Sequence, residues 1–327
     1  MRRLIVIALL LHVSGLACTG PKETFTLKPD PPEGFFVLKT GTITDSNCRY
    51  DTKTTSTFQA EMEMELLGEV KNRQSDGSYE QTYRITRYKI KQVIDGNVLF
   101  EGDTKTGSFS DDKLKKIAET ILAGRFGVRF GRDGKVVSSS GFEQFSGEVD
   151  ALPRDEKYNG MIIGMRDNFQ KQFVDGMNDG EDLYPKQPVG VGQSWKFEPR
   201  ESLTQWGKYR TEGKTRFQAL EEDSRGDALA VLRHTVAGKQ SASKTVEFDN
   251  CKSTTRNGRH ETVTTLKFNI DKKYSVESKT ETTRTYDMLF EYADPSSGNV
   301  TGTAKETMVS WMKVRPAGNE ETETESP

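Results

Sequence analysis

The sequence predicts an α+β protein that is mostly β, with a large, curved, half-barrel-like antiparallel sheet packed on two helices. Several segments alternate polar and apolar residues over more than the usual strand length of about 3–10 residues. Two other segments place apolar residues three and four positions apart, which is the period of a helix. Long strands in such number favour a strongly curved sheet, whose concave side needs a filling layer.

The clearest strand signal covers residues 56–66, where one face is small or apolar and the other is polar. The even positions are Ser56, Phe58, Ala60, Met62, Met64 and Leu66, and the odd positions are Thr57, Gln59, Glu61, Glu63 and Glu65. The three glutamates share a face and invite a metal site, but the polar half of an alternating strand explains them better. After the Asp76-Gly77 turn the alternation resumes and changes phase near Arg87, which predicts a β-bulge.

Two helices are expected on this sheet. Ser110 or Asp111 can cap the first, and Gly124 can end it. The second covers residues 158–177, with one apolar stripe formed by Tyr158, Met161, Ile162, Met165, Phe169, Phe173 and Met177. We expect this helix to fill the concave side of a sheet built from both halves of the chain.

The second half of the chain is again β-rich. The longest signal is residues 274–292, where Tyr274, Val276, Tyr286, Met288, Phe290 and Tyr292 hold one phase. A last strand is expected from Val300 to Val314. We therefore predict one β-rich unit over residues 35–315, in one piece or as two lobes that meet near residues 185–195.

Residues 1–17 have the layout of a secretory signal peptide: Arg2 and Arg3, an apolar run from Leu4, and small residues before Cys18. Ser14-Gly15-Leu16-Ala17-Cys18 also fits a permissive lipobox, although Gly15 stands where most such boxes have Leu. Lipidation of Cys18, for instance with palmitate, is the expectation. Cleavage near Ala17 that leaves a free or paired cysteine is the alternative.

Both ends of the chain outside the β-rich unit are expected to be disordered. Residues 18–34 carry four prolines and little that is apolar, so we interpret them as a tether. Residues 316–327 form an acidic tail. Without the signal and the tail, the body has no net formal charge and no basic block, which argues against a nucleic-acid partner.

Few residues suit catalysis or metal binding. Beyond Cys18, only Cys48 and Cys251 remain, which is too few for a structural zinc site. Because an export signal implies an oxidising compartment, they are disulfide candidates. The alternative is two isolated small residues held apart. His234 and His260 have no identifiable partner, so the sequence implies no catalytic residue, metal or cofactor.

A ligand cavity is one interpretation of the Met-rich helix. Its candidates are Met161, Met165, Phe169 and Phe173, since thioethers adapt to irregular apolar shapes; core filler is the commoner role for such residues. Downstream, Gly190 and Gly192 precede Trp195, which we expect to pack as an anchor where this loop enters the sheet. These three residues are predicted to be structural.

Three short sequence motifs resemble those of a known family. They are Phe130-Gly131-Arg132-Asp133-Gly134-Lys135-Val136, Pro188-Val189-Gly190-Val191-Gly192-Gln193-Ser194-Trp195 and Phe268-Asn269-Ile270-Asp271-Lys272-Lys273-Tyr274-Ser275-Val276. Over Phe35 to Val314 the chain resembles an uncharacterised family of bacterial surface lipoproteins, in which a Pro-Val-x-Val-Gly-x-Ser-Trp phrase joins two β-rich halves. The family has no established activity, so the resemblance implies no catalytic residues. Its general architecture is similar to the half-barrel carriers of lipids and lipoproteins in the periplasm, a likeness of fold only.

The resulting expectation is a non-catalytic, exported lipoprotein that faces the periplasm or the cell exterior. Its partners would be a membrane, through the lipid anchor, and an apolar or lipid-like ligand in a sheet-helix cavity. The alternative is a structural or interaction protein of the cell envelope, with a filled core and an envelope protein as partner. An enzyme is the third and least favoured class, because His and Cys are scarce.

The anchor can be tested by replacing its cysteine. Cys18→Ser is expected to move the protein from the membrane fraction to the soluble fraction, because each buried lipid CH₂ contributes about 0.8 kcal/mol to anchoring. Fractionation after a carbonate wash measures this. A Cys18→Ser protein that still sediments with membranes would contradict the lipobox interpretation.

Overall fold

The computed structural model describes residues 23–152, 156–179, 183–204, 207–247, 251–294 and 298–318. The predicted signal peptide, Cys18 and the acidic tail from residue 319 lie outside the described residues. Among those that are described, we find no helix that combines the length and the apolar character needed to cross a bilayer.

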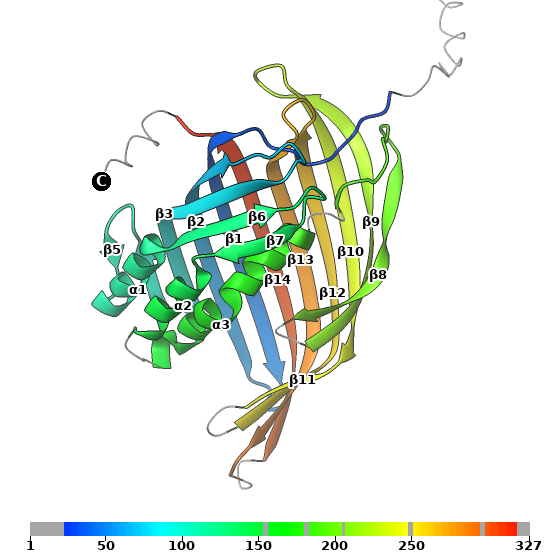
Figure 1. Ribbon diagram of the computed structural model, residues 1–327. Helices are drawn as coiled ribbons and strands as arrows, with labels where there is room; N and C mark the ends of the chain where they lie inside the picture. The colour runs from blue at the N-terminus through cyan, green and yellow to red at the C-terminus, as the bar shows by residue number, and fades with distance from the viewer. Residues whose placement is uncertain are drawn as a thin grey trace, which may run out of the picture.

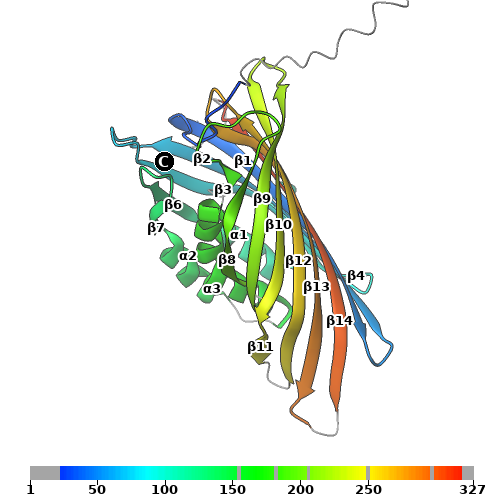
Figure 2. The ribbon, with the colours of Figure 1, turned by 90° about the vertical axis from the view of Figure 1, so that its right-hand side faces the viewer.

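One antiparallel sheet contains the fourteen strands of the described chain, and it is strongly twisted and curved (Figures 1 and 2). Its main path runs β5-β4-β3-β2-β1-β14-β13-β12-β10-β9-β8, while β6 pairs with β3 and β7, and β11 pairs with β12. The strands are β1 Gly34–Tyr50, β2 Thr55–Lys71, β3 Tyr79–Ile94, β4 Asn97–Asp103, β5 Ser108–Phe109, β6 Arg125–Phe130, β7 Val136–Ser140, β8 Ser194–Thr204, β9 Gly207–Glu222, β10 Ala228–Ala242, β11 Lys244–Glu247, β12 Cys251–Asn269, β13 Tyr274–Tyr292 and β14 Asn299–Pro316. The prediction of a mostly β protein with a large antiparallel sheet is confirmed.

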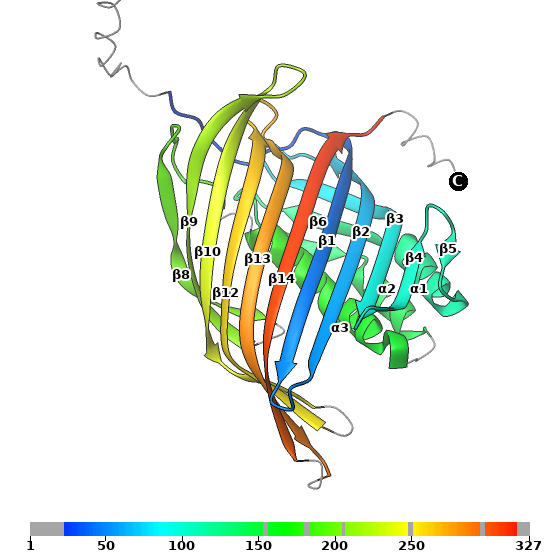
Figure 3. The same ribbon diagram turned by 180° about the vertical axis from the view of Figure 1, so that it is seen from behind.

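The first and last long strands join the two halves into one sheet. β1 and β14 pair from Phe36 opposite Pro316 to Tyr50 opposite Gly302, without a register shift. The two lobes that the sequence left open are therefore two parts of one continuous sheet (Figure 3).

Several local predictions hold. β2 includes the alternating segment, with its even residues on the better buried face. The bulge lies where the phase changes: Glu65 pairs with Arg87 but Leu66 pairs with Ile85, which leaves one extra residue in β3. The first helix begins after Asp111, whose carboxylate accepts a 3.0 Å hydrogen bond from the backbone N–H of Leu114.

Among the described residues, three α-helices and not the predicted two lie on one face of the sheet, which we call the inner face (Figure 1). They are α1 Asp112–Ala123, α2 Phe142–Asp150 and α3 Glu156–Asp179. The sequence analysis missed α2. This helix is short, and its N-cap Gly141 has a left-handed backbone and offers no side-chain cap, so the usual start signal is absent.

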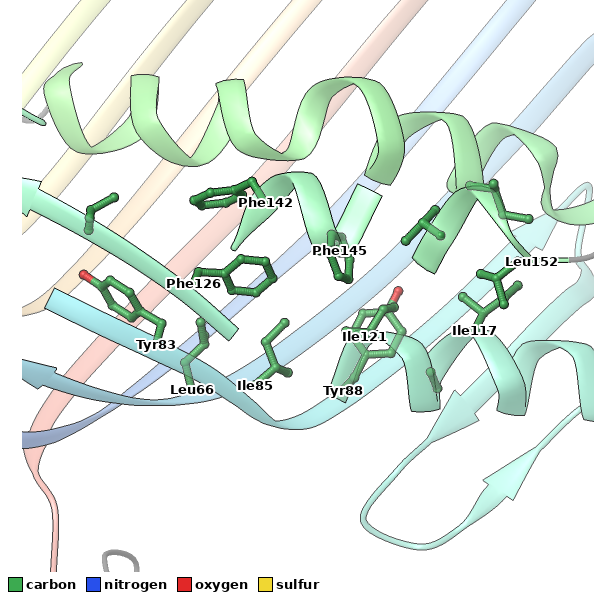
Figure 4. Packing of buried hydrophobic residues seen from close by; sticks show 14 of the residues in the cluster. Leu66, Tyr83, Ile85, Tyr88, Ile117, Ile121, Phe126, Phe142, Phe145 and Leu152 are labelled. Carbon is green, nitrogen blue, oxygen red and sulfur yellow. The ribbon is translucent and has the colours of Figure 1, made fainter. Parts of the chain in front are cut away.

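The helices pack on β2, β3, β4 and β6 around a core that we call the helix-side cluster. Its buried members are Leu66, Val70, Tyr79, Tyr83, Ile85, Tyr88, Phe100, Leu114, Ile117, Ala118, Ile121, Phe126, Val128, Phe130, Phe142, Phe145, Val149, Leu152, Tyr158 and Ile162. Phe126 lies at its centre, with ring centroids 4.8 Å from Phe142 and 5.3 Å from Phe145 (Figure 4). Aromatic rings thus occupy the space between helices and sheet.

A second apolar core lies near the other end of the sheet. Its buried members are Leu27, Phe217, Ala230, Leu232, Leu266 and Phe268. Phe25 forms a β-bridge with Val189, and its ring packs edge to face on Phe217 at 5.9 Å.

The prediction of a tether from residue 18 to residue 34 is therefore wrong for the part that the structure describes, from Glu23 onward. Leu27 is only 1% exposed, and the backbone N–H of Asp30 donates to Lys273 O at 2.8 Å. Phe25 and Leu27 are few, but each finds an apolar site on β9, β10 and β12. Burial of two large side chains is enough to order this short segment.

Leu27→Ala tests whether the N-terminal segment belongs to the fold. We expect the free energy of unfolding to fall by about 2–5 kcal/mol, because a fully buried Leu loses its contacts and leaves a cavity. Chemical denaturation measures this, with Leu220→Ala as the control, because Leu220 is 42% exposed. Equal effects of the two substitutions would contradict this assignment.

Candidate functional site

The inner face beyond the helices, over β1, β14, β13, β12, β10 and β9, is rich in hydroxyl groups. In one row, residues directly opposite each other on successive strands are Thr42, Ser310, Thr280, Thr264, His234 and Thr215. Some neighbours in this row are hydrogen-bonded, with 3.2 Å between the hydroxyls of Thr42 and Ser310 and 2.9 Å between those of Thr264 and Thr280. His234 is a satisfied core residue, since its Nδ1 lies 2.8 Å from Thr215 Oγ1.

Two rows further along the strands, the inner face carries charged and aromatic groups that we call the inner-face cluster: Tyr209, His260, Arg284 and Glu306. Glu306, Arg284 and His260 are consecutive cross-strand partners on β14, β13 and β12. Arg284 Nη1 donates to the Glu306 carboxylate at 2.6 Å, and the two side chains are only 15% and 10% exposed. The pair is thus buried and carries no net charge.

Two glycines make room for the ring systems of this cluster. A Cβ on Gly238 would lie 2.1 Å from Cε1 of His260, and a Cβ on Gly258 would lie 2.0 Å from the Tyr209 hydroxyl. The rings of Tyr209 and His260 are 5.2 Å apart. The His260 ring and the Tyr209 hydroxyl therefore occupy space that a side chain at Gly238 or Gly258 would fill. Arg284 acts electrostatically on both Tyr209 and His260.

Among the described residues, the Tyr209 hydroxyl and Nδ1 of His260 are buried polar atoms of this cluster without a hydrogen-bond partner. Such atoms are uncommon in native proteins, and each costs about 1–3 kcal/mol if it stays unpaired. Water or a polar ligand that reaches this cluster would satisfy both atoms.

Burial sets the protonation states of the cluster. It lowers the pKa of His260, an effect to which Arg284 adds, so the imidazole is neutral near pH 7. It raises the pKa of Glu306, while the Arg284 guanidinium acts in the opposite direction. Burial also raises the pKa of Tyr209. A neutral imidazole and a neutral phenol can donate and accept hydrogen bonds, which suits recognition of a polar ligand.

The four predicted cavity residues are partly buried and lie beside the helix-side cluster. Met161, Met165, Phe169 and Phe173 all pack against it. The ring of Phe169 lies 5.1 Å from Phe126, and that of Phe173 lies 5.3 Å from Tyr83. The structure brings these side chains together at the place that the helical spacing indicated, among aromatic rings.

The three predicted structural residues form the entry to β8. Gly192 has φ of +90° and donates its N–H to Phe217 O at 2.7 Å. The N–H of Gly190 donates to the Gln193 side chain at 2.7 Å. Trp195 is half-buried and packs against the second apolar core.

The disulfide prediction is wrong, because Cys48 and Cys251 are both free thiols. They lie on β1 and β12, with β14 and β13 between them. Three interstrand spacings amount to about 14 Å, whereas a disulfide requires Cα atoms within about 7 Å. The alternative, two isolated cysteines held apart, describes the structure.

The glutamates of β2 are occupied by basic neighbours. Lys89 Nζ lies 2.6 Å from the Glu61 carboxylate, and Lys39 Nζ lies 2.7 Å from that of Glu65. Among the residues that the structure describes, no three His, Cys, Asp or Glu side chains are grouped as a metal site.

A hollow of about 250 Å³ lies on the outer face, opposite the helices, with Leu67, Arg84 and Arg125 in its wall. The Arg125 guanidinium donates to the carbonyl oxygens of Leu122, Ala123 and Gly124 at 2.9–3.1 Å. Because these carbonyls end α1, Arg125 has a structural task, and this hollow is a weaker candidate site than the inner-face cluster.

Sequence reasoning did not find Tyr209, Arg284 or Glu306. It considered His260 but assigned it no partner, because its neighbours come from β9, β13 and β14, at distant positions in the chain. Strand parity places Arg284 on the same face as Tyr286 and Met288. The one signal available in the sequence is that Arg284 places a charge on a strand face that otherwise carries apolar or hydroxyl residues.

Comparison with known proteins adds little about function. A family of unknown function (DUF6263) has a model that matches residues 76–223, from the turn before β3 to the end of β9. This region includes all three described helices and the loop before Trp195. It is thus similar to an uncharacterised domain. No curated protein sequence matches the chain.

Similar solved structures share only broad features with the chain. A lipovitellin structure, described by its lipid-protein interactions, has a TM-score of 0.37 and 10% identity over 90% of this chain. The present chain spans only 26% of that lipovitellin chain. An outer membrane channel from Pseudomonas putida F1 has a TM-score of 0.22 and 8% identity, over 88% of this chain and 98% of its own. Neither likeness is close enough to carry an argument.

His260 should contribute a pH-dependent part of the stability. Its pKa is lower in the folded protein than in the unfolded chain, so the unfolded state binds the extra proton as the pH falls below about 6.5. We expect wild-type stability to decrease between pH 7.5 and pH 5.5, and His260→Gln to flatten this decrease. Denaturation midpoints at about these two pH values measure it, and equal slopes in both proteins would contradict the assignment.

Proposed function

We propose that this protein is a non-catalytic, lipid-anchored binding protein of the bacterial cell envelope. It faces the periplasm or the cell exterior and binds a polar, hydroxyl-bearing ligand of the saccharide class on the inner face of its sheet. The observation that carries this proposal is the pair of buried, unpaired polar atoms, the Tyr209 hydroxyl and His260 Nδ1, beside the Arg284 and Glu306 ion pair.

The chemistry of the inner face supports a hydroxyl-bearing ligand. The backbone groups of the strands are used in the sheet, so the face offers only side chains. Thr and Ser hydroxyls both donate and accept hydrogen bonds, as do the hydroxyls of a sugar. A peptide would pair better with a strand edge, where backbone groups are available.

The apolar ligand expected from the sequence has less support. The candidate residues Met161, Met165, Phe169 and Phe173 contact the aromatic rings of the helix-side cluster. Closely packed rings favour core filling at this place over an acyl-chain cavity. The second candidate function is therefore a structural or interaction protein of the envelope with a filled core.

Tyr209→Phe separates a binding role from a structural role. Loss of an unpaired buried hydroxyl should leave stability unchanged or raise it, because its desolvation cost disappears. Loss of a ligand hydrogen bond should weaken binding by about twofold to tenfold. Thermal unfolding gives the first quantity, and calorimetric titration with N-acetylglucosamine oligomers and glucose oligomers gives the second.

Tyr292→Phe is the matched control, since Tyr292 is 39% exposed and lies at the far end of β13. It should change neither quantity. A Tyr209→Phe protein that is less stable by about 1 kcal/mol or more would show that the hydroxyl supports the fold. Unchanged affinity for every oligomer that wild-type protein binds would also contradict the proposal.

A further inference from the structure

Strands β8, β9, β10 and β12 lie side by side at one end of the sheet (Figure 3). Their outer face carries seven exposed cations, and we call it the basic face. They are Lys196, Arg210, Lys214, Arg216, Arg233, Lys239 and Arg259. None of the seven has an ion pair or a side-chain hydrogen bond within the described chain. These cations are therefore available to bind an anion, although Arg233 also interacts electrostatically with Glu281.

Four cross-strand pairs at the basic face join like charges, although Arg210 is also opposite Glu201 on β8. Lys196 is opposite Lys214, Arg216 is opposite Arg233, and Lys239 lies between Arg210 and Arg259. Like charges directly opposite each other destabilise a sheet. The fold thus accepts a loss of stability at four cross-strand positions.

The other end of the same outer face is built differently. There Lys39 is opposite Glu65, Lys89 is opposite Glu63, and Lys91 is opposite Glu61. Lys39 and Lys89 form ion pairs with these glutamates at 2.7 and 3.7 Å. One sheet therefore balances its charges at β1, β2 and β3, and leaves an excess of positive charge at β8, β9, β10 and β12.

A hollow of about 580 Å³ lies within the basic face. Arg210, Lys239 and Arg259 line it, together with Glu212 and Glu261. These five residues have the opposite strand parity to His260, so their side chains project outward. The volume of this hollow falls in the range of about 300–1,000 Å³ that is usual for small-ligand sites. The hollow is therefore large enough for a phosphodiester headgroup.

The start of the described chain lies at this end of the sheet. Phe25 contacts Phe217, the chain neighbour of Arg216. Only four residues lie between Cys18 and Glu23, so the Cα atoms of these two residues are at most about 18 Å apart. An anchor at Cys18 would thus hold this end of the sheet close to the bilayer, where positive charge is attracted to anionic lipids.

We infer that the basic face docks on the anionic phospholipid headgroups of the membrane that holds the lipid anchor. A phosphate enters the hollow between Arg210, Lys239 and Arg259, while Lys214 and Arg216 contact neighbouring headgroups. Glu212 and Glu261 reduce the attraction, so docking depends on several cations together. The inference rests on the anchor proposed above, and it adds a second, electrostatic contact that orients the protein.

Vesicle binding by a chain without lipid tests the basic face apart from the anchor. The probe is the mature chain, residues 18–327, with Cys18→Ser, mixed with vesicles of phosphatidylcholine alone or with one third phosphatidylglycerol. We expect sedimentation only with the anionic vesicles, and release when salt rises from about 0.1 M to about 0.5 M. Binding to both vesicle types, or to neither, would overturn the inference.

A charge-reversed variant tests the named residues. Each Lys or Arg near an anionic surface contributes a factor of about five, so Lys214→Glu with Arg216→Glu should lower the partition coefficient at least tenfold. The control is Lys115→Glu with Lys116→Glu, an equal change of charge at exposed positions on α1. A matching loss in the control would overturn the inference. Binding of heparin without binding of anionic vesicles would assign the face to a polyanion and also overturn it.

These results are distinguishable from failure of the anchor. If Cys18→Ser leaves the cellular protein on membranes, the proposed lipid attachment fails. Vesicle binding by the unlipidated chain would still report on the basic face. Lys214→Glu with Arg216→Glu replaces two like-charge cross-strand pairs by opposite-charge pairs, so its unfolding midpoint should be equal to or higher than that of the wild type. Lys115→Glu with Lys116→Glu should keep the wild-type midpoint, and together these values verify that loss of binding is not loss of fold.

Discussion

The pairing of β1 with β14 is the interaction on which the rest of the structure depends. Fifteen residue pairs join the two strands, from Phe36 and Pro316 to Tyr50 and Gly302. On one side lie the strands that carry the helices, and on the other lie β13, β12, β10, β9 and β8. Without this contact the two halves would end in long open edges, which are prone to intermolecular pairing.

The two faces of the continuous sheet carry different kinds of residues. On the inner face, apolar residues gather at the helix-side cluster and at the second core, while hydroxyl rows and the Arg284 and Glu306 pair lie beyond the helices. Replacing one partner of a buried ion pair costs more free energy than the pair itself contributes to stability. Arg284 and Glu306 therefore depend on each other. On the outer face, charges are balanced at β1, β2 and β3, whereas β8, β9, β10 and β12 carry an excess of positive charge.

Local signals in the sequence predicted much of the fold and little of the candidate site. The alternation of residues 56–66, the Asp111 cap and the bulge near Arg87 each depend on neighbours in the chain, and each is present in the structure. The inner-face cluster depends on cross-strand register among β9, β12, β13 and β14, which no short window contains. The disulfide prediction failed for the same reason. The cellular compartment and the number of cysteines do not indicate the distance between Cys48 and Cys251 in the fold.

The ordering of the N-terminal segment shows a different limit. Residues 18–34 are poor in apolar groups on average, and this composition predicted a disordered tether. Phe25 and Leu27 are the apolar exceptions. Two side chains were enough, because the sheet already presents an apolar site beside Phe217. A composition argument measures what a segment can bury against itself, whereas order here depends on what the rest of the chain offers.

The two edge strands of the open sheet have features that oppose pairing with another chain. At one end β5 has only two residues, which leaves little edge to pair with another chain. At the other end β8 carries the exposed residues Lys196, Glu198, Pro199, Arg200 and Glu201. Pro199 lies between Phe197 and Arg200, where the register shifts, and it has no N–H to donate. Charge and proline together oppose the addition of a further strand, so this sheet can stay open and keep both of its faces accessible to ligands.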